Sequence, residues 1–310
     1  MISRRNIRVK VMQTLYSLDS MSGEIKPGEP QTILNKKIDQ SSQLFTYLIY
    51  FITEVGRYAE KDALKKASKH LPTADDLSIN TKISGNEILW KILEEPTFKA
   101  SIGNAKLHSL LDSELVRKIY QLLVEAPEYK EYIEEQARDK KSEKKMLDFI
   151  FCNLMLPNEN FIAHIEELFI NWDDDGEMMQ TLVLNYLNRP GQQSFHDILS
   201  KEKWEFARNL LATVQEKEAY TLELIKPKLN NWDAERIAAL DLIILRMGVC
   251  EFLYFETIPT KVTINEYIDL AKDYSTVQSG QFVNGLLDNI HKELMTANKI
   301  DKKSFKNSTL

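Results

Sequence analysis

Three arginines and one tyrosine near the N-terminus have the types and spacing of a single-stranded RNA site. Arg4, Arg5 and Arg8 precede Tyr16 at helical intervals. Guanidinium groups neutralise phosphates, and aromatic rings stack on unpaired bases. The apolar positions between them predict a helix over residues 3–18, with one buried face and these side chains on its flank. The alternative is an amphipathic helix whose basic side is simply solvated.

Charge is distributed unevenly along the chain. The net charge is −6, which by itself argues against a polyanionic partner. Residues 1–20 and residues 292–310 carry +3 each, which leaves −12 for the residues between them. Basic ends on an acidic chain favour a localised phosphate-binding surface over non-specific polyanion binding, although basic termini can also be merely solvated.

Composition indicates a soluble globular protein of one large or two ordinary domains. The 310 residues are 43% hydrophobic and 28% charged, and the two cysteines are too few for a disulfide framework. The longest apolar run, residues 44–52, is too short to cross a membrane. With no signal peptide at the N-terminus, we expect a cytoplasmic protein without a membrane partner.

Motifs of enzymes and metal sites are missing from the sequence. It has no glycine-rich phosphate loop, no Gly-x-Ser-x-Gly and no Cys-x-x-Cys. His164 lacks a second histidine four residues away, and residues 173–176 lack the ligand pattern of a calcium loop, so we interpret them as a loop that caps the next helix. We therefore predict no catalytic residue, no cofactor and no metal ligand.

The densest helix signals lie in residues 231–294. Asp233 is a good N-cap residue, and the residues after it are apolar on nearly every side, which predicts a buried central helix. Thr263 and Glu266 have the spacing of a capping box and predict the start of a second helix. A third helix is predicted from Phe282 onward.

The same region contains a series of short motifs in a fixed order. They are Leu245-Arg246-Met247-Gly248, Glu251, Ile258-Pro259, Ile264-Asn265-Glu266, Leu270-Ala271-Lys272, Phe282-Val283-Asn284-Gly285, Leu287 and Asp288. In this order and spacing they resemble the NusB family of bacterial transcription antitermination factors. The resemblance also covers the arginine-rich opening, where Asn6 replaces a frequent further arginine, and residues 204–211.

This resemblance implies an all-α fold made of a NusB-like pair of helical subdomains and a helical insertion. The core would comprise residues 1–20 and 195–296. Residues 21–194 would be the insertion, which partly completes the N-terminal subdomain, and residues 297–310 a flexible basic tail. Within the insertion, periodicity and Pro, Gly or Asn breaks predict helices over residues 33–69, 86–94, 113–125, 128–137, 142–156, 159–171 and 177–188.

The resemblance further implies a non-enzymatic RNA-binding factor. It would bind a boxA-type single-stranded element of ribosomal RNA leaders together with the small-subunit ribosomal protein NusE, within an antitermination complex on RNA polymerase. The implied roles are phosphate binding for Arg4, Arg5 and Arg8, stacking for Tyr16 and Phe282, proximity to RNA for Gln278, and docking of the protein partner for Glu251.

Two residues of this region have structural interpretations. Arg246 lies in an apolar helix and needs an ion-pair partner, for which Glu266 and Asp269 are candidates. Gly285 is expected to permit close packing of helices.

Other functions remain open at this point. A scaffold that binds proteins without RNA specificity is the main alternative. A second alternative is a ribosomal RNA cytosine methyltransferase, because a NusB-like domain precedes the catalytic part of some of these enzymes. This alternative requires a cofactor-binding domain C-terminal to the NusB-like domain. The third alternative is an enzyme within the insertion.

Overall fold

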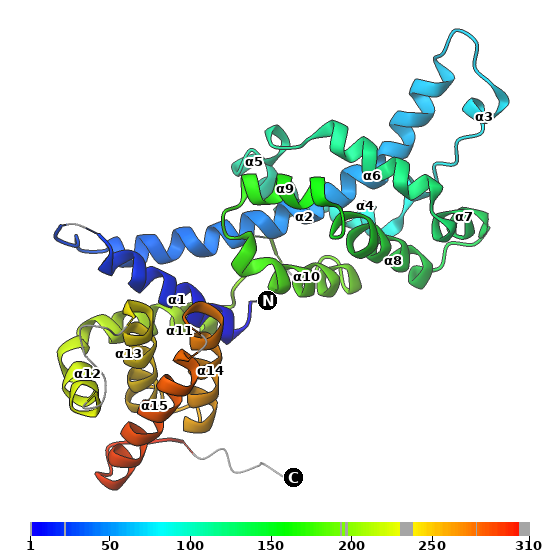
Figure 1. Cartoon of the computed structure of the whole chain (residues 1–310). Coiled ribbons are helices and arrows are strands. Elements are labelled where there is room, and N and C mark those ends of the chain that lie inside the picture. The colour runs from blue at the N-terminus through cyan, green and yellow to red at the C-terminus, as the bar shows by residue number, and fades with distance from the viewer. Residues whose placement is uncertain are drawn as a thin grey trace, which may run out of the picture. The chain divides into compact units, whose positions relative to one another are not determined.

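A computed structural model describes residues 2–21, 23–192, 194–195, 198–229, 238–276 and 278–303. Within these ranges the regular structure is helical and contains no strand, so the predicted all-α class is confirmed. The chain divides into two compact units. We call residues 2–38 with 199–303 the core unit, and residues 39–198 the inserted unit (Figure 1).

The core unit is built around α13. This helix is buried on nearly all sides and packs against the five other complete α-helices that the structure describes in this unit. The prediction of a buried central helix is therefore confirmed, while its predicted N-cap, Asp233, lies outside the described residues. The helices of the unit are α1 (Arg4–Asp19), the start of α2 (Glu29–Ala67), α11 (Lys201–Glu216), α12 (Glu218–Ile225), a 3₁₀ turn (Lys226–Lys228), α13 (Ala239–Tyr254), α14 (Thr260–Tyr274) and α15 (Ser279–Thr296).

Helix α1 begins as the sequence predicts. The Ser3 hydroxyl accepts a hydrogen bond from the backbone N–H of Asn6, which satisfies one of the free amides at the helix start. Its apolar face, Ile7, Val11, Leu15 and Leu18, is buried.

The predicted capping box of α14 is wrong. The helix already begins at Thr260, directly after Pro259, so Thr263 lies inside it. The Thr263 hydroxyl donates to Glu251, and the Glu266 carboxylate pairs with Arg8. The buried Glu251 carboxylate binds Thr263 and the buried Arg8 guanidinium binds Glu266, so neither side chain forms the predicted cap.

Close helix packing occurs at Gly248 and not at Gly285. A Cβ atom on Gly248 would lie 2.9 Å from Leu287 Cδ2, whereas one on Gly285 would meet nothing within 4 Å. The prediction for Gly285 is therefore wrong, because that face of α15 is exposed.

The inserted unit is a set of short helices around the long helix α2, whose Tyr47 and Phe51 pack against Phe161, Phe169 and His164. The sequence predicted one helix with its observed bounds, at residues 113–125, and missed the two helices at residues 74–77 and 96–104. It placed the acidic residues 173–175 in a loop, although they form the first turn of a helix. The elements after α2 are α3 (Ala74–Leu77), a 3₁₀ turn (Lys82–Gly85), α4 (Glu87–Glu94), α5 (Pro96–Asn104), a second 3₁₀ turn (Leu107–Ser109), α6 (Ser113–Glu125), α7 (Pro127–Glu134), α8 (Lys140–Phe149), a π-helical segment (Ile150–Met155), α9 (Glu159–Leu168) and α10 (Trp172–Asn188).

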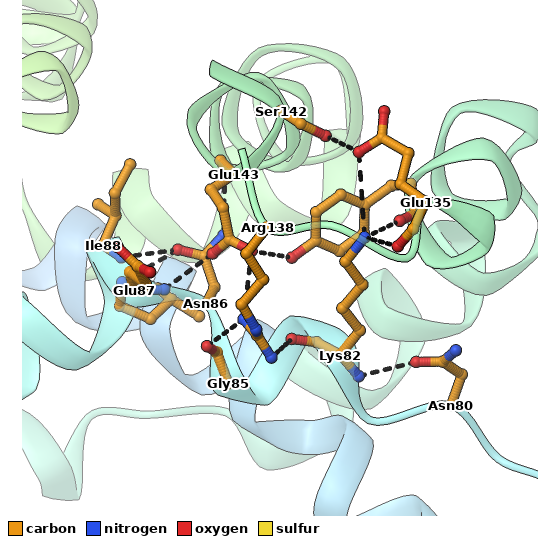
Figure 2. A network of polar contacts seen from close by, with 12 residues as sticks. Asn80, Lys82, Gly85, Asn86, Glu87, Ile88, Glu135, Arg138, Ser142 and Glu143 are labelled. Carbon is orange, nitrogen blue, oxygen red and sulfur yellow. Dashed lines mark hydrogen bonds and ion pairs between the residues drawn. The ribbon is translucent and has the colours of Figure 1, made fainter. Parts of the chain in front are cut away.

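A polar network joins α4, α7 and α8 inside this unit (Figure 2). The buried Glu143 carboxylate accepts hydrogen bonds from the Glu87 amide at 2.8 Å and the Tyr132 hydroxyl at 3.1 Å, and it pairs with Arg138 at 3.2 Å. The Lys82 ammonium donates to the backbone carbonyls of Tyr132 and Glu135 at the end of α7. Because the Glu143 carboxylate on α8 binds groups of α4 and α7, the network fixes these three helices relative to one another.

None of the described helices combines the length and the apolar character needed to span a membrane.

Candidate nucleic-acid interface

Arg4 and Arg5 lie at the surface of α1. Their side chains are 39% and 38% exposed. Arg4 pairs with Glu202 at 2.6 Å, and Arg5 pairs with Asp273 at 2.8 Å and with Asp269 at 3.6 Å. Exposed ion pairs contribute roughly 0–1 kcal/mol each, so a phosphate can replace these carboxylates at little cost. Both arginines are therefore available to RNA.

Arg8 lies in the interior instead. Its side chain is 2% exposed and holds Glu251 through two hydrogen bonds, Nε to Oε2 at 2.9 Å and Nη2 to Oε1 at 2.8 Å. Its third nitrogen lies 3.3 Å from Glu266 Oε2, and the guanidinium lies over the rings of Phe206 and Tyr267. In this conformation no phosphate can reach Arg8, which corrects its predicted role.

Glu251 is also fully buried. Besides the two hydrogen bonds from Arg8, its oxygens accept one from Thr263 Oγ1 at 2.8 Å and one from the Tyr267 hydroxyl at 3.1 Å. A carboxylate with no exposed surface cannot contact a protein partner directly, so the structure corrects this prediction too. Glu251 instead joins α1 and α14 to α13.

The electrostatics keep Arg8 and Tyr267 each in one protonation state. Burial alone would lower the pKa of Arg8, but its hydrogen bond to Glu251 and the neighbouring negative charges raise that pKa above its ordinary value. Burial, followed by the charge of Glu251, raises the pKa of Tyr267 well above 10. Arg8 therefore remains charged, and Tyr267 remains a hydroxyl donor.

The basic tail is docked at its start. Lys302 Nζ donates to the carbonyls of Glu251 and Phe255 at 2.8 Å each, where α13 ends and its last carbonyls lack helical partners. Burial lowers the pKa of Lys302 to about 8, although Glu251 and Glu256 act in the opposite direction. Lys303 pairs with Glu256 at 2.9 Å.

Tyr16 is 45% exposed and follows Arg5 by eleven residues. That spacing places it about 16 Å further along α1 and within about 20° of the same face. Arg8, which was predicted to lie on the same flank, and Met12, which lies between Arg8 and Tyr16, are both buried. This flank of α1 is thus exposed only at its two ends.

The two predicted site residues of α15 differ in exposure. Gln278 is exposed at the N-cap position, while Phe282 is only 9% exposed and packs mainly into the core. The loop before α15 is held by the Ser279 hydroxyl, which lies 2.8 Å from Asp241 Oδ2 and 2.8 Å from the Thr276 hydroxyl.

A surface pocket between α14 and α15 brings together side chains that were not among the predicted site residues. Three carboxamides and one lysine supply its polar groups, and its Asp269 is also an Arg5 partner. Carboxamides can donate to and accept from base edges, and lysine binds phosphate. In the sequence, the i, i+3 spacing of Gln281 and Asn284 already indicates that these two carboxamides share one face of a helix. The pocket is lined by Asn265, Ile268, Asp269, Lys272, Gly280, Gln281 and Asn284.

Arg246 forms the expected structural ion pair, but with other partners. It lies 3.1 Å from Glu218 and 3.9 Å from Asp19. The predicted partners Glu266 and Asp269 pair with Arg8 and Arg5 instead. Position 246 faces α12 and the end of α1, whereas α14 lies on another side of α13.

The comparisons by sequence agree on one family. The profile of the NusB family matches residues 163–292. The transcription antitermination protein NusB of Salinibacter ruber is 36% identical over 142 residues, which cover 44% of this chain and 82% of that protein. The protein of the same name from Listeria monocytogenes serotype 4a is 36% identical over 101 residues, or 33% of this chain and 79% of that one. A solved structure of T. maritima NusB has 31% sequence identity and a TM-score of 0.30, and the match covers 40% of this chain and 82% of that one.

Proposed function

The chain belongs to the NusB family, and from this premise we propose that it is a non-enzymatic, RNA-binding transcription antitermination factor. The observation that carries the proposal is the pair of exposed arginines, Arg4 and Arg5, at one end of α1. Asp269, which pairs with Arg5, also lines the amide-rich pocket of α14 and α15. The groups that we propose to bind phosphate and to read bases thus adjoin within the core unit.

The proposed ligand is single-stranded boxA-type RNA from ribosomal RNA leaders, bound together with the ribosomal protein NusE in an antitermination complex on RNA polymerase. On binding, Arg5 would exchange Asp269 and Asp273 for a backbone phosphate. Lys272 would neutralise a second phosphate, and Tyr16 would stack on a base. The ring edge of Phe282 and the amide of Gln278 would border the same RNA.

The buried cluster has a positioning role in this proposal. Arg8 and Glu251 fix α1 against α13 and α14, and the orientation of α1 determines where Arg4 and Arg5 point. The carboxylates beside the arginines oppose RNA when the protein is alone. A partner that adds positive charge would therefore make RNA binding cooperative.

Fluorescence anisotropy of a labelled boxA-type RNA tests the proposal directly. We expect tighter binding of this RNA than of a scrambled sequence, and a further gain when NusE is added. Binding of NusE without any preference for the RNA would instead support the alternative of a protein-interaction scaffold. The carboxylates that already pair with Arg4 and Arg5 are the observation that favours this alternative.

A further inference from the structure

A polar pocket lies at the C-terminal end of α10 in the inserted unit. It is lined by Asn185, Tyr186, Asn188, Arg189 and Gln192. Three carboxamides and one guanidinium share this concave surface, and none of the carboxylates that the structure describes lines it. That composition contrasts with the unit as a whole, because residues 39–198 contain 27 acidic and only 18 basic side chains.

A tight turn holds two of these side chains in place. The backbone N–H of Gln192 donates to the carbonyl of Arg189, and the two residues between them are Pro190 and Gly191. Proline presets the first central position of a type II turn, and the φ of +81° at Gly191 suits the second. Arg189 and Gln192 therefore lie at the two ends of one rigid turn.

Tyr186 forms a fixed wall of the pocket. It is 2% exposed, and its ring packs edge-on against Phe45 and Phe195. Its hydroxyl donates to Glu95 Oε2 at 2.7 Å, and Thr97 occupies the other oxygen of this carboxylate. Both oxygens of Glu95 are thus engaged within the unit.

Arg189 differs from the other eight arginines that the structure describes. Each of those eight faces a carboxylate or, in the case of Arg208, an aromatic ring. Arg189 is exposed and, within the described ranges, has neither. A guanidinium presents two parallel N–H groups that fit two phosphate oxygens, and carboxamide NH₂ groups supply further donors.

We propose that this pocket binds the phosphate group of a small phosphorylated ligand, such as a nucleoside monophosphate. Arg189 pairs with two phosphate oxygens, and the amides of Asn188 and Gln192 donate to the remaining ones. Carboxamides also accept hydrogen bonds, so the amide of Asn185 can bind the base or the sugar. The site lies wholly in the inserted unit and is independent of the RNA surface proposed for the core unit.

Isothermal titration calorimetry of the 310-residue chain with AMP, inorganic phosphate and adenosine tests the proposal. AMP and phosphate are expected to bind saturably, and adenosine to bind at least tenfold more weakly than AMP. Arg189→Ala is expected to weaken AMP binding about tenfold or more, as loss of a charge-assisted hydrogen bond does. Arg117→Ala, an equal charge change on α6 in the same unit, should leave the affinity unchanged.

A second variant changes the charge of the pocket while keeping its shape. Asn188 is exposed, so Asn188→Asp should fold normally, and its new carboxylate would compete with phosphate for Arg189. Loss of AMP binding in this variant, with an unchanged circular dichroism spectrum, supports the proposal. Any of three results would overturn it: no saturable binding of AMP or phosphate, equal affinity for adenosine and AMP, or unchanged AMP affinity in Arg189→Ala.

Discussion

Arg8 and Glu251 form a buried ion pair with two parallel hydrogen bonds, of 2.9 and 2.8 Å, although 243 residues separate them in the chain. The pair joins the first helix of the protein to its central helix. Thr263 and Tyr267 complete the carboxylate's hydrogen bonds from α14. The exposed arginines of α1 therefore have a fixed position relative to the α14–α15 pocket.

Removing one member of this pair should destabilise the core unit strongly. Leaving a buried charge without its partner costs about 3–5 kcal/mol, so Arg8→Ala and Glu251→Gln should increase hydrogen exchange of the α1 amides. Arg5→Ala, which removes only an exposed ion pair, should change their protection by about 0–1 kcal/mol. Unchanged α1 exchange in both buried variants, measured by mass spectrometry, would contradict the positioning role.

Lys302 should titrate well below an ordinary lysine. Burial lowers its pKa from 10.5 to about 8, so between pH 8 and 10.5 the unfolded chain binds more protons at this residue than the folded chain. This residue's contribution to stability therefore rises with pH across that window and is lost as the pH falls through 8. Lys302→Met should remove that part of the pH dependence.

The neighbouring Lys303 provides the matched control. Its hydrogen bond to Glu256 raises its pKa above the ordinary value. NMR titration of the two lysine side chains should therefore give clearly different midpoints. Two coinciding midpoints near 10.5 would show that the tail does not dock on α13.

The two glycines should respond oppositely to alanine. In Gly248→Ala the new methyl group would press on the buried Leu287, and such overpacking costs about 1–3 kcal/mol. In Gly285→Ala the methyl group enters open space, and the better helix propensity should stabilise the protein by up to ~1 kcal/mol. Thermal unfolding measures both shifts. Equal shifts for the two variants would disprove the close approach at Gly248.

The carboxamides of the α14–α15 pocket should contribute sequence preference rather than salt dependence. Asn265→Ala should weaken binding of boxA-type RNA by about 1–3 kcal/mol, as loss of a bidentate base contact does. The slope of affinity against salt should stay the same because no charge is removed. Asn209→Ala, an exposed amide on α11, is the control. Equal effects of the two substitutions on anisotropy titrations would argue against base reading in the pocket.

The sequence predicted the local features well. The Ser3 cap, the apolar face of α1 and the buried α13 follow from periodicity and from capping preferences. It could not assign the partners of Arg8, Glu251 and Arg246, because these ion pairs link segments far apart in the chain. Spacing alone placed Arg8 beside Arg5 on one flank, yet the packing of three helices buried the first and left the second exposed.

The most direct test of RNA recognition compares Arg5→Glu with Arg57→Glu. Arg57 is also exposed and ion-paired, but it lies in the inserted unit. Affinity for labelled boxA-type RNA would be measured by anisotropy with NusE across a salt series. The proposed function predicts that Arg5→Glu alone weakens binding and lowers the log–log salt slope by about 0.7, the value for one phosphate contact on a single strand. Equal affinity and slope in the two variants would contradict it.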